Sequence, residues 1–196
     1  MKTGKKNIVL FVGPTPPPFS GPELSMKEFL SSAILRDFFE IEFVRTNFRK
    51  SNQKKGKFGI KMVIGSLSYF TRLILSLVAK RPELVYYPIT PTQLGWIGRD
   101  VWTILLCKAF GIKVLIHLRG SHFMANFNRF NLFAKKIVSN SLSRVDGAIV
   151  QADYLHDQFS SFMHRAKIHT LYQSINTSEY SLRSHLDKKE LTILVV

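Results

Sequence analysis

Short apolar runs alternate along the chain with longer segments in which apolar residues recur at helical spacing. The apolar runs have the length of strands and cover residues 7–12, 39–45, 84–87, 113–118, 146–150 and 167–172. The helical patterns between them cover residues 22–36, 59–80, 97–110, 123–143 and 153–162. Because strands that alternate with helices form βαβ units, the pattern predicts an α/β fold with a doubly wound, mostly parallel six-stranded sheet.

Several residues mark the ends of these helical patterns. Gly111 follows the third pattern as a C-terminal stop, and Asp153 stands where it can cap the fifth. Arg99 and Asp100 are interpreted as a helix start, with Asp100 complementing the helix dipole. Their position after the third strand also places them near the expected ligand crevice.

The usual strand order of a doubly wound sheet, 3-2-1-4-5-6, places the first and fourth strands side by side where the winding reverses. Ligands bind outside the carboxyl ends of the strands at that reversal. We therefore expect two loops to face each other, residues 13–22 after the first strand and residues 117–122 after the fourth.

The first loop is rich in proline and lacks the glycine spacing of a dinucleotide-binding fingerprint. It ends with Ser20 and Gly21 at a helix start, and Pro22 suits the first helical position. The free N–H groups of such a first turn form an anion site. A rigid strand-to-helix connector remains an alternative role for this loop.

The second loop carries two histidines and an arginine at the end of an apolar strand. Alternation along the strand places His117 and Arg119 on the same side. The arginine offers a planar fork of donors suited to phosphate or carboxylate, and either His117 or His122 could donate a hydrogen bond or act as an acid or base. A lone histidine at a strand end is more often a satisfied polar group, but this grouping favours a site.

The net charge of +15 adds a requirement for an anionic partner, because 28 Lys and Arg face only 13 Asp and Glu. Residues 43–82 and 101–145 contain no acid at all. Such surfaces attract phosphate on nucleic acid, on lipid headgroups or on a sugar nucleotide. A basic stretch at residues 48–58 precedes an apolar helix, which is typical of a membrane-surface site and equally of a solvated loop before a sheet-covering helix.

Three further features bear on the cellular compartment, on membrane insertion and on metal binding. The single cysteine, Cys107, excludes a disulfide framework and is interpreted as a small core residue in a reducing compartment. The N-terminal apolar run is too short for a secretory signal, and Arg72 interrupts the membrane-like stretch at residues 62–79, so we expect no membrane span. The histidines lack the spacing of a metal site.

Taken together, these residues resemble the N-terminal domain of a retaining GT-B glycosyltransferase of family 4. Residues 16–23 resemble the P-P-x-x-G-G loop of that family, and residues 117–121 resemble its H-x-H-G or T-x-H-G sequence. Residues 173–176 stand where the family has an Asn-Gly hinge. The departures are Ser20 in place of the first paired glycine, Arg119 in place of a histidine, and the missing Asn-Gly.

The resemblance implies a domain plan. Residues 1–176 would form the Rossmann-like N-terminal domain, residues 177–190 an interdomain linker, and residues 191–196 the first strand of a second domain. Family members carry two glutamates seven residues apart in that second domain, and this chain has no such pair. The resemblance therefore implies that residues 1–196 are the acceptor-binding half and inactive alone.

The resemblance also implies an activity: transfer of a hexosyl-type sugar, with retention, from a nucleotide-sugar donor to a lipid-linked or polysaccharide acceptor in bacterial polysaccharide or glycolipid assembly. The implied roles are catalytic for His117 and Arg119, donor phosphate-binding for Ser20 and Gly21, and acceptor-binding for Gly120, Ser121 and His122. Neither a metal nor another cofactor is expected.

The expected partners are the nucleotide sugar, the saccharide or lipid-linked acceptor, and an anionic membrane surface, but not nucleic acid. The expected location is cytoplasmic, peripheral on the inner face of the plasma membrane. Two alternatives stay open: a non-catalytic basic module that binds nucleic acid or anionic membrane, and a half-enzyme whose other domain is a separate subunit.

Overall fold

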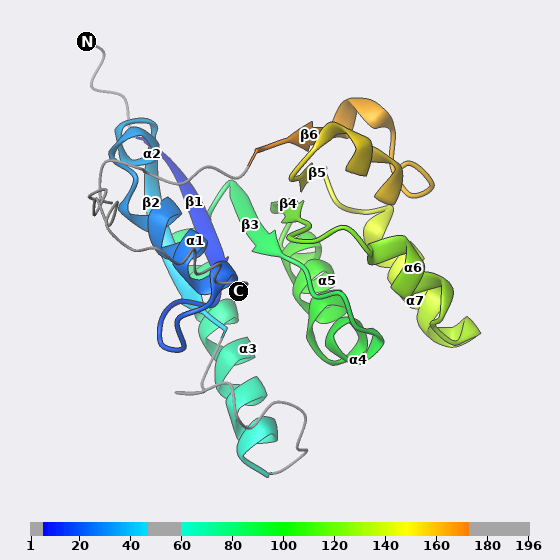
Figure 1. Cartoon of the computed structure of the whole chain (residues 1–196). Coiled ribbons are helices and arrows are strands. Elements are labelled where there is room, and N and C mark those ends of the chain that lie inside the picture. Colours follow the sequence, from blue (N-terminus) through cyan, green and yellow to red (C-terminus); the bar gives the residue numbers. More distant parts are fainter. Residues whose placement is uncertain (1–5, 47–59, 173–196) are drawn as a thin grey trace, which may run out of the picture.

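The computed structural model describes residues 6–46 and 60–172. They form one parallel six-stranded sheet flanked by helices (Figure 1), which confirms the predicted fold class. The strands are β1 (Asn7–Gly13), β2 (Phe39–Arg45), β3 (Leu84–Pro88), β4 (Lys113–His117), β5 (Gly147–Val150) and β6 (Ile168–Thr170). Each begins and ends within two residues of its predicted run. The predicted hinge at 173–176, linker at 177–190, last strand at 191–196 and basic stretch at 48–58 lie outside the described residues.

The strand order is β2-β1-β3-β4-β5-β6, so the predicted order with the first and fourth strands adjacent is wrong. The connection from β2 carries the chain back past β1, and β3 then pairs with the free edge of β1, where Phe11 lies beside Tyr86. The winding therefore reverses between β1 and β3. Ligands are expected at the carboxyl ends of this strand pair.

The helices keep the predicted positions but are more divided. They are α1 (Gly21–Ser31), α2 (Ala33–Phe38), α3 (Ile60–Lys80), α4 (Gln93–Gly95), the π-helix η2 (Trp96–Asp100), α5 (Val101–Ala109), α6 (Phe123–Asn128), α7 (Leu132–Leu142) and the 3₁₀ turns η3 (Asp153–Gln158) and η4 (Arg165–Lys167). Ser32 ends α1 and caps α2, where its hydroxyl accepts a 3.3 Å bond from the Leu35 N–H. Asn131 caps α7 in the same way, at 2.8 Å from the Ala134 nitrogen.

Of the two residues predicted to end or cap a helix, Gly111 does so and Asp153 does not. Gly111 ends α5 with a positive φ of 71°, and its N–H donates to the Lys108 carbonyl, as expected of a stop signal. Asp153 does not cap a helix, because its carboxylate accepts hydrogen bonds from the Thr170 and Tyr172 hydroxyls instead. It links η3 to the end of β6.

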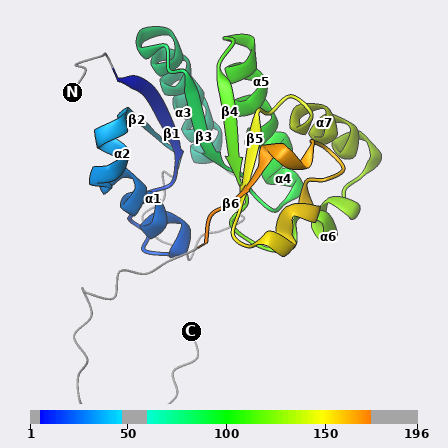
Figure 2. The same ribbon diagram turned by 90° about the horizontal axis from the view of Figure 1, so that it is seen from above.

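Helices cover the two faces of the sheet unequally. Figure 2 shows α1 and α2 on one side of the sheet and α3, α5 and α7 on the other. The smaller core under α1 contains Val9, Phe11, Met26 and Tyr86. The larger core on the opposite face contains Tyr87 and Cys107, and burial raises the pKa of the Cys107 thiol to about 12. Consecutive residues of β3, Tyr86 and Tyr87, therefore serve opposite faces.

The loops that follow the strands gather at the carboxyl edge of the sheet, because all six strands are parallel. The loop after β3 is bonded to β4, since the Ile89 N–H donates to the His117 carbonyl at 3.0 Å. The loop after β4 is bonded in turn to β5 through the Leu118 N–H and the Ile149 carbonyl. Among the described residues, no helix is long and apolar enough to cross a membrane.

Candidate functional site

His117 closes β4 and is buried, with 3% of its surface exposed. Its Nδ1 lies 2.5 Å from the Tyr86 hydroxyl oxygen on β3. Its Nε2 is buried and has no hydrogen-bond partner within the described part of the chain. Burial, together with the charge of Arg119, lowers the pKa of His117 to about 3, so the ring is neutral at neutral pH.

The hydrogen bonds around Tyr86 favour one tautomer of His117. Arg119 donates from Nη2 to the Tyr86 oxygen at 3.1 Å, so the single hydroxyl proton of Tyr86 is available for His117 Nδ1. Nδ1 then accepts, and the ring proton lies on Nε2. His117 thus presents a buried N–H donor that a ligand oxygen can accept.

Arg119 joins the two loops that we expected to face each other. Its Nη1 donates to the Pro22 carbonyl in the first turn of α1 at 2.7 Å, and its Cζ lies 5.6 Å from the centre of the Phe29 ring. The Nε atom is buried and unpartnered among the described residues. The loops therefore meet although β3 lies between their strands, because the Arg119 side chain spans the gap.

At the predicted phosphate site at the start of α1, the side chains of Ser20 and Glu23 bond to each other. Ser20 is the N-cap residue, and its hydroxyl donates to the Glu23 carboxylate. Gly21 is exposed, and nothing lies within 4 Å of the position that a Cβ would take there. The first turn is accessible, but the negative charge of Glu23 opposes a second anion.

The other predicted loop residues, Gly120, Ser121 and His122, are exposed. The Ser121 hydroxyl and His122 Nδ1 are 2.7 Å apart and bond to each other. His122 directly precedes α6. These residues line the rim of the carboxyl edge, outside the buried contact of His117 with Tyr86.

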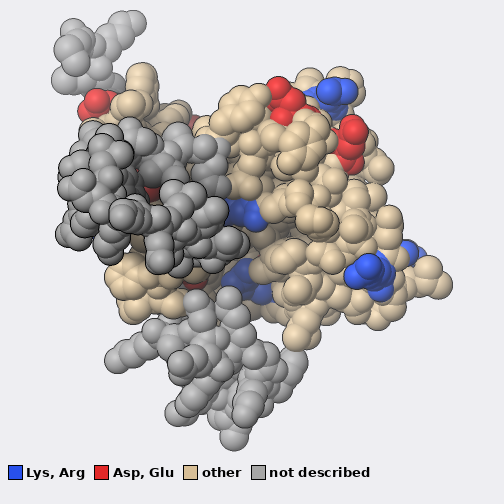
Figure 3. All heavy atoms as spheres, in the orientation of Figure 1, with Lys and Arg blue, Asp and Glu red and all other residues tan. Residues whose placement is uncertain are grey.

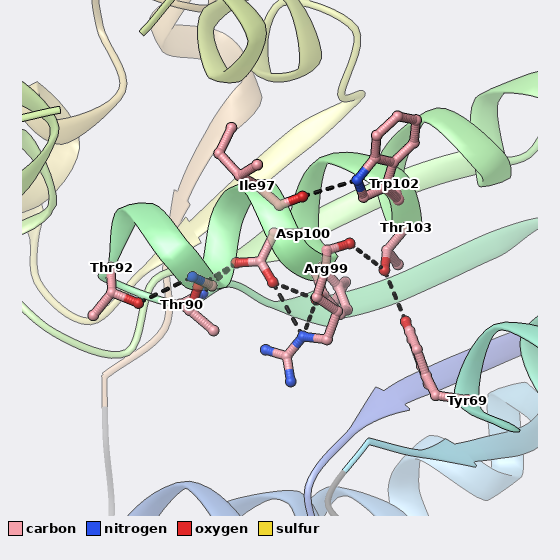
Figure 4. Close-up of polar contacts among 10 residues, drawn as sticks. Tyr69, Thr90, Thr92, Ile97, Arg99, Asp100, Trp102 and Thr103 are labelled. Atoms are coloured by element: carbon pink, nitrogen blue, oxygen red, sulfur yellow. Dashed lines mark hydrogen bonds and ion pairs between the residues drawn. The ribbon is translucent and has the colours of Figure 1, made fainter. Parts of the chain in front are cut away.

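Asp100 is the most deeply buried charge at this edge, and its interpretation as a helix start is wrong. It ends the π-helix η2 with a fully buried side chain. Its carboxylate accepts a bond from the Tyr87 hydroxyl at 2.6 Å. It also accepts bonds from the Thr90 backbone and hydroxyl, both at 2.7 Å (Figure 4). Asp100 therefore fixes the loop that leaves β3.

Arg99 completes this cluster from the same helical turn. Its Nε donates to the Tyr87 hydroxyl at 2.9 Å and to Asp100 at 3.2 Å. Burial opposes its charge, but the Tyr87 and Asp100 oxygens outweigh this, and the pKa of Arg99 is raised. Thr103 donates to the Arg99 carbonyl and lies 2.8 Å from the Tyr69 hydroxyl, so the cluster connects β3, η2, α5 and α3.

Arg45 is a positioning residue whose role was not predicted from the sequence. It ends β2, and its Nη2 donates to the Thr15 and Pro17 carbonyls at 2.9 and 2.8 Å. It thereby holds the proline-rich loop against the sheet. In Figure 3, which has the orientation of Figure 1, Lys and Arg side chains reach the surface near the middle of the molecule. The signal in the sequence was an arginine at the last position of an apolar strand-like run.

The described residues contain no group of three His, Cys, Asp or Glu that could hold a metal ion. A hollow of about 530 Å³ lies at the opposite, amino edge of the sheet, lined by the end of α3 and by residues 110–113. Its lining includes Arg81, Glu83 and Lys113 but no Ser, Thr, Cys or His and no buried unpartnered side-chain atom. We therefore place the candidate site at the carboxyl edge, where His117 and Arg119 have such atoms.

Comparison with known proteins supports the fold. No family model matches the chain, and no curated protein is found to be similar. The chain is similar to the crystal structure of a protein from Listeria monocytogenes assigned as a UDP-N-acetylglucosamine 2-epimerase, with a TM-score of 0.55 and 12% identity. The match covers 84% of this chain and 44% of that one. It shows the Rossmann-like fold of GT-B-like proteins, and the chain spans less than half of that protein.

Proposed function

We propose that this chain is the acceptor-side domain of a retaining glycosyltransferase of the family 4 type, which uses a nucleotide-sugar donor and a lipid-linked or polysaccharide acceptor. The observation that carries the proposal is the neutral, buried His117 at the carboxyl edge beside Arg119; the Nε2 of His117 has no partner among residues 6–46 and 60–172. A GT-B-like fold supports it, as does a structural neighbour whose name contains a nucleotide sugar. The donor-binding half would come from a second domain or subunit.

The proposed reaction breaks the bond between the sugar's anomeric carbon and the donor diphosphate, and forms a bond from the same carbon to an acceptor hydroxyl oxygen. The hydroxyl proton leaves with the nucleoside diphosphate. His117 does not take this proton, because a ring with a pKa of about 3 is a weak base. Its Nε2–H instead orients a sugar oxygen, and Arg119 stabilises the negative charge that grows on the diphosphate.

The proposal also includes the roles expected from the sequence for the start of α1, for residues 120–122 and for the positive surface. Gly21 and the first turn of α1 would meet the donor diphosphate once the Glu23 side chain leaves Ser20. Gly120, Ser121 and His122 would line the acceptor entrance. The positive surface would hold the domain on the cytoplasmic face of an anionic membrane, and the reaction would need no metal or cofactor.

The test uses the full-length protein, a panel of nucleotide sugars and a polyprenyl-phosphate-linked acceptor, with nucleoside diphosphate release as the readout. We expect His117→Ala and Arg119→Ala each to lower kcat by about a hundredfold, as is typical for the loss of one oriented donor. His169→Ala and Arg144→Ala are matched controls, because both residues are exposed. Wild-type rates in both site variants, with folding intact, would remove this cluster from the reaction.

A further inference from the structure

The guanidinium of Arg99 is anchored through its inner nitrogen while its outer end stays open. Nε makes both anchoring bonds, to Tyr87 and to Asp100. Within residues 6–46 and 60–172, no hydrogen-bond partner is found for Nη1 or Nη2. Figure 4 shows these two nitrogens pointing away from the η2–α5 helix, and 32% of the side chain is exposed.

This arrangement differs from an ordinary structural ion pair. Arginine usually offers two parallel N–H groups to a carboxylate that it neutralises. Asp100 receives only the Nε bond from Arg99, and its other bonds come from Tyr87 and Thr90. The Tyr87 ring also supports the cation, with Arg99 Cζ 5.8 Å from the ring centre. The outer fork is thus left for another acceptor, and its direction is fixed.

The open fork lies beside the reversal of strand winding. Arg99 bonds to Tyr87, the last residue but one of β3, whose carboxyl end adjoins that of β1. The ends of β1 and β3 lie close together, because a Cβ added at Gly13, the last residue of β1, would be 3.3 Å from Cγ of Pro88, the last residue of β3. Arg119 bonds to Tyr86 on the other face of the same strand. The two arginines therefore lie on opposite faces of the end of β3.

We propose that Arg99 is an anion-binding residue that takes a phosphate or carboxylate group of a ligand on its two outer nitrogens, at a subsite separate from His117 and Arg119. The ligand must offer two oxygens to a planar fork, which both groups do. The rigid support from Asp100 means that little side-chain entropy is lost on binding. The subsite is independent of the reaction proposed above, since binding can be measured without turnover.

The deciding experiment is a titration of the full-length protein with pyrophosphate and, separately, with glucuronate, followed in arginine side-chain ¹H–¹⁵N NMR spectra. Triple-resonance spectra of the wild-type protein assign the Arg99 signals. We expect saturable shifts of the wild-type Arg99 signals with at least one of the two probes, and about tenfold or more weaker binding to Arg99→Lys, because lysine cannot form the fork. Arg144→Lys is the matched control and should bind as the wild type does.

The two probes separate the possible sources of the anion. A response to pyrophosphate alone identifies a phosphate ligand, and a response to glucuronate alone identifies an acidic sugar. Wild-type Arg99 signals that do not move with either probe would overturn the proposal, as would equal binding by folded Arg99→Lys. The wild-type titration decides the question even if Arg99→Lys fails to fold. A negative result in the transferase assay would not change the outcome of this titration.

Discussion

Tyr86 is the residue through which the two chemical groups of the candidate site act together. Its hydroxyl accepts from Arg119 and lies 2.5 Å from His117 Nδ1. Because one hydroxyl serves both partners, the His117 tautomer depends on the position of Arg119. Burial raises the pKa of Tyr86, so the hydroxyl keeps its proton at neutral pH. The site is thus a linked set of donors with a fixed direction.

The lowered pKa of His117 gives a prediction for stability as a function of pH. The unfolded chain takes up a proton near the ordinary value of 6.5, whereas the folded chain does so only near 3. Stability contributed by neutral His117 is therefore lost as pH falls below 6.5. We expect His117→Gln, which cannot titrate, to reduce the loss of unfolding free energy between pH 7 and pH 5 by about 1 to 2 kcal/mol.

Urea unfolding at the two pH values measures this difference. His169→Gln serves as the control, because His169 is exposed on β6. If His117→Gln and the wild type lose the same stability between pH 7 and pH 5, His117 is not held neutral by its surroundings.

At the scale of elements, the start of α1 combines an accessible helix terminus with an acid that opposes anions. Glu23 lies in the first turn and bonds to Ser20. We expect Glu23→Gln to lower the KM for the nucleotide sugar about two- to fivefold, since it removes a negative charge worth up to about 1 kcal/mol at a helix terminus. Steady-state kinetics of the full-length protein measures this change in KM.

Glu28→Gln is the matched control for this change. Glu28 lies in the same helix and is exposed, but it is beyond the first turn. An equal effect of the two substitutions would mean that overall charge matters and that the α1 terminus is not a phosphate site.

The buried Asp100 cluster sets the position of the element that carries Arg99. Asp100→Asn keeps the size but puts an NH2 group in place of one carboxylate oxygen, so it faces donors either from Tyr87 and Arg99 or from Thr90. We expect it to lower the unfolding free energy by about 3 kcal/mol, because buried donors are left without acceptors. Asp157→Asn, at an exposed position of η3, should change it by less than about 0.5 kcal/mol. Urea unfolding at pH 7 compares them, and a loss below 1 kcal/mol for Asp100→Asn would contradict the assigned network.

The strands were predictable because each is a short apolar run, and their bounds follow from local sequence. The strand order was not, since the pairing of β3 with β1 depends on contacts across more than 70 residues, such as Phe11 with Tyr86. The break at Ser32 was missed because the apolar periodicity continues through it, although serine is a common cap. His117 and Arg119 could be predicted from one loop, whereas Tyr86 contacts them only because β3 pairs with β4 in the folded sheet.

For the whole molecule, the net charge of +15 and an apolar stripe on α3 suggest a membrane surface as partner. Leu67 and Leu75 on this helix are 68% and 61% exposed, and Lys80 and Arg81 follow at its end. Basic residues attract anionic lipid with about 1 kcal/mol each, and exposed leucines add binding that salt does not screen. We expect cosedimentation with phosphatidylglycerol vesicles and little with neutral vesicles.

The double substitution Leu67→Gln and Leu75→Gln should weaken vesicle binding several-fold, most clearly at high salt, where the electrostatic part is screened. Leu132→Gln is the control, because Leu132 on α7 is more exposed than either leucine of α3. A basic module for nucleic acid behaves differently: an oligonucleotide would bind with a steep salt dependence and displace the protein from vesicles. That outcome, with vesicle binding insensitive to the leucine changes, would favour the nucleic-acid alternative over a membrane-bound transferase.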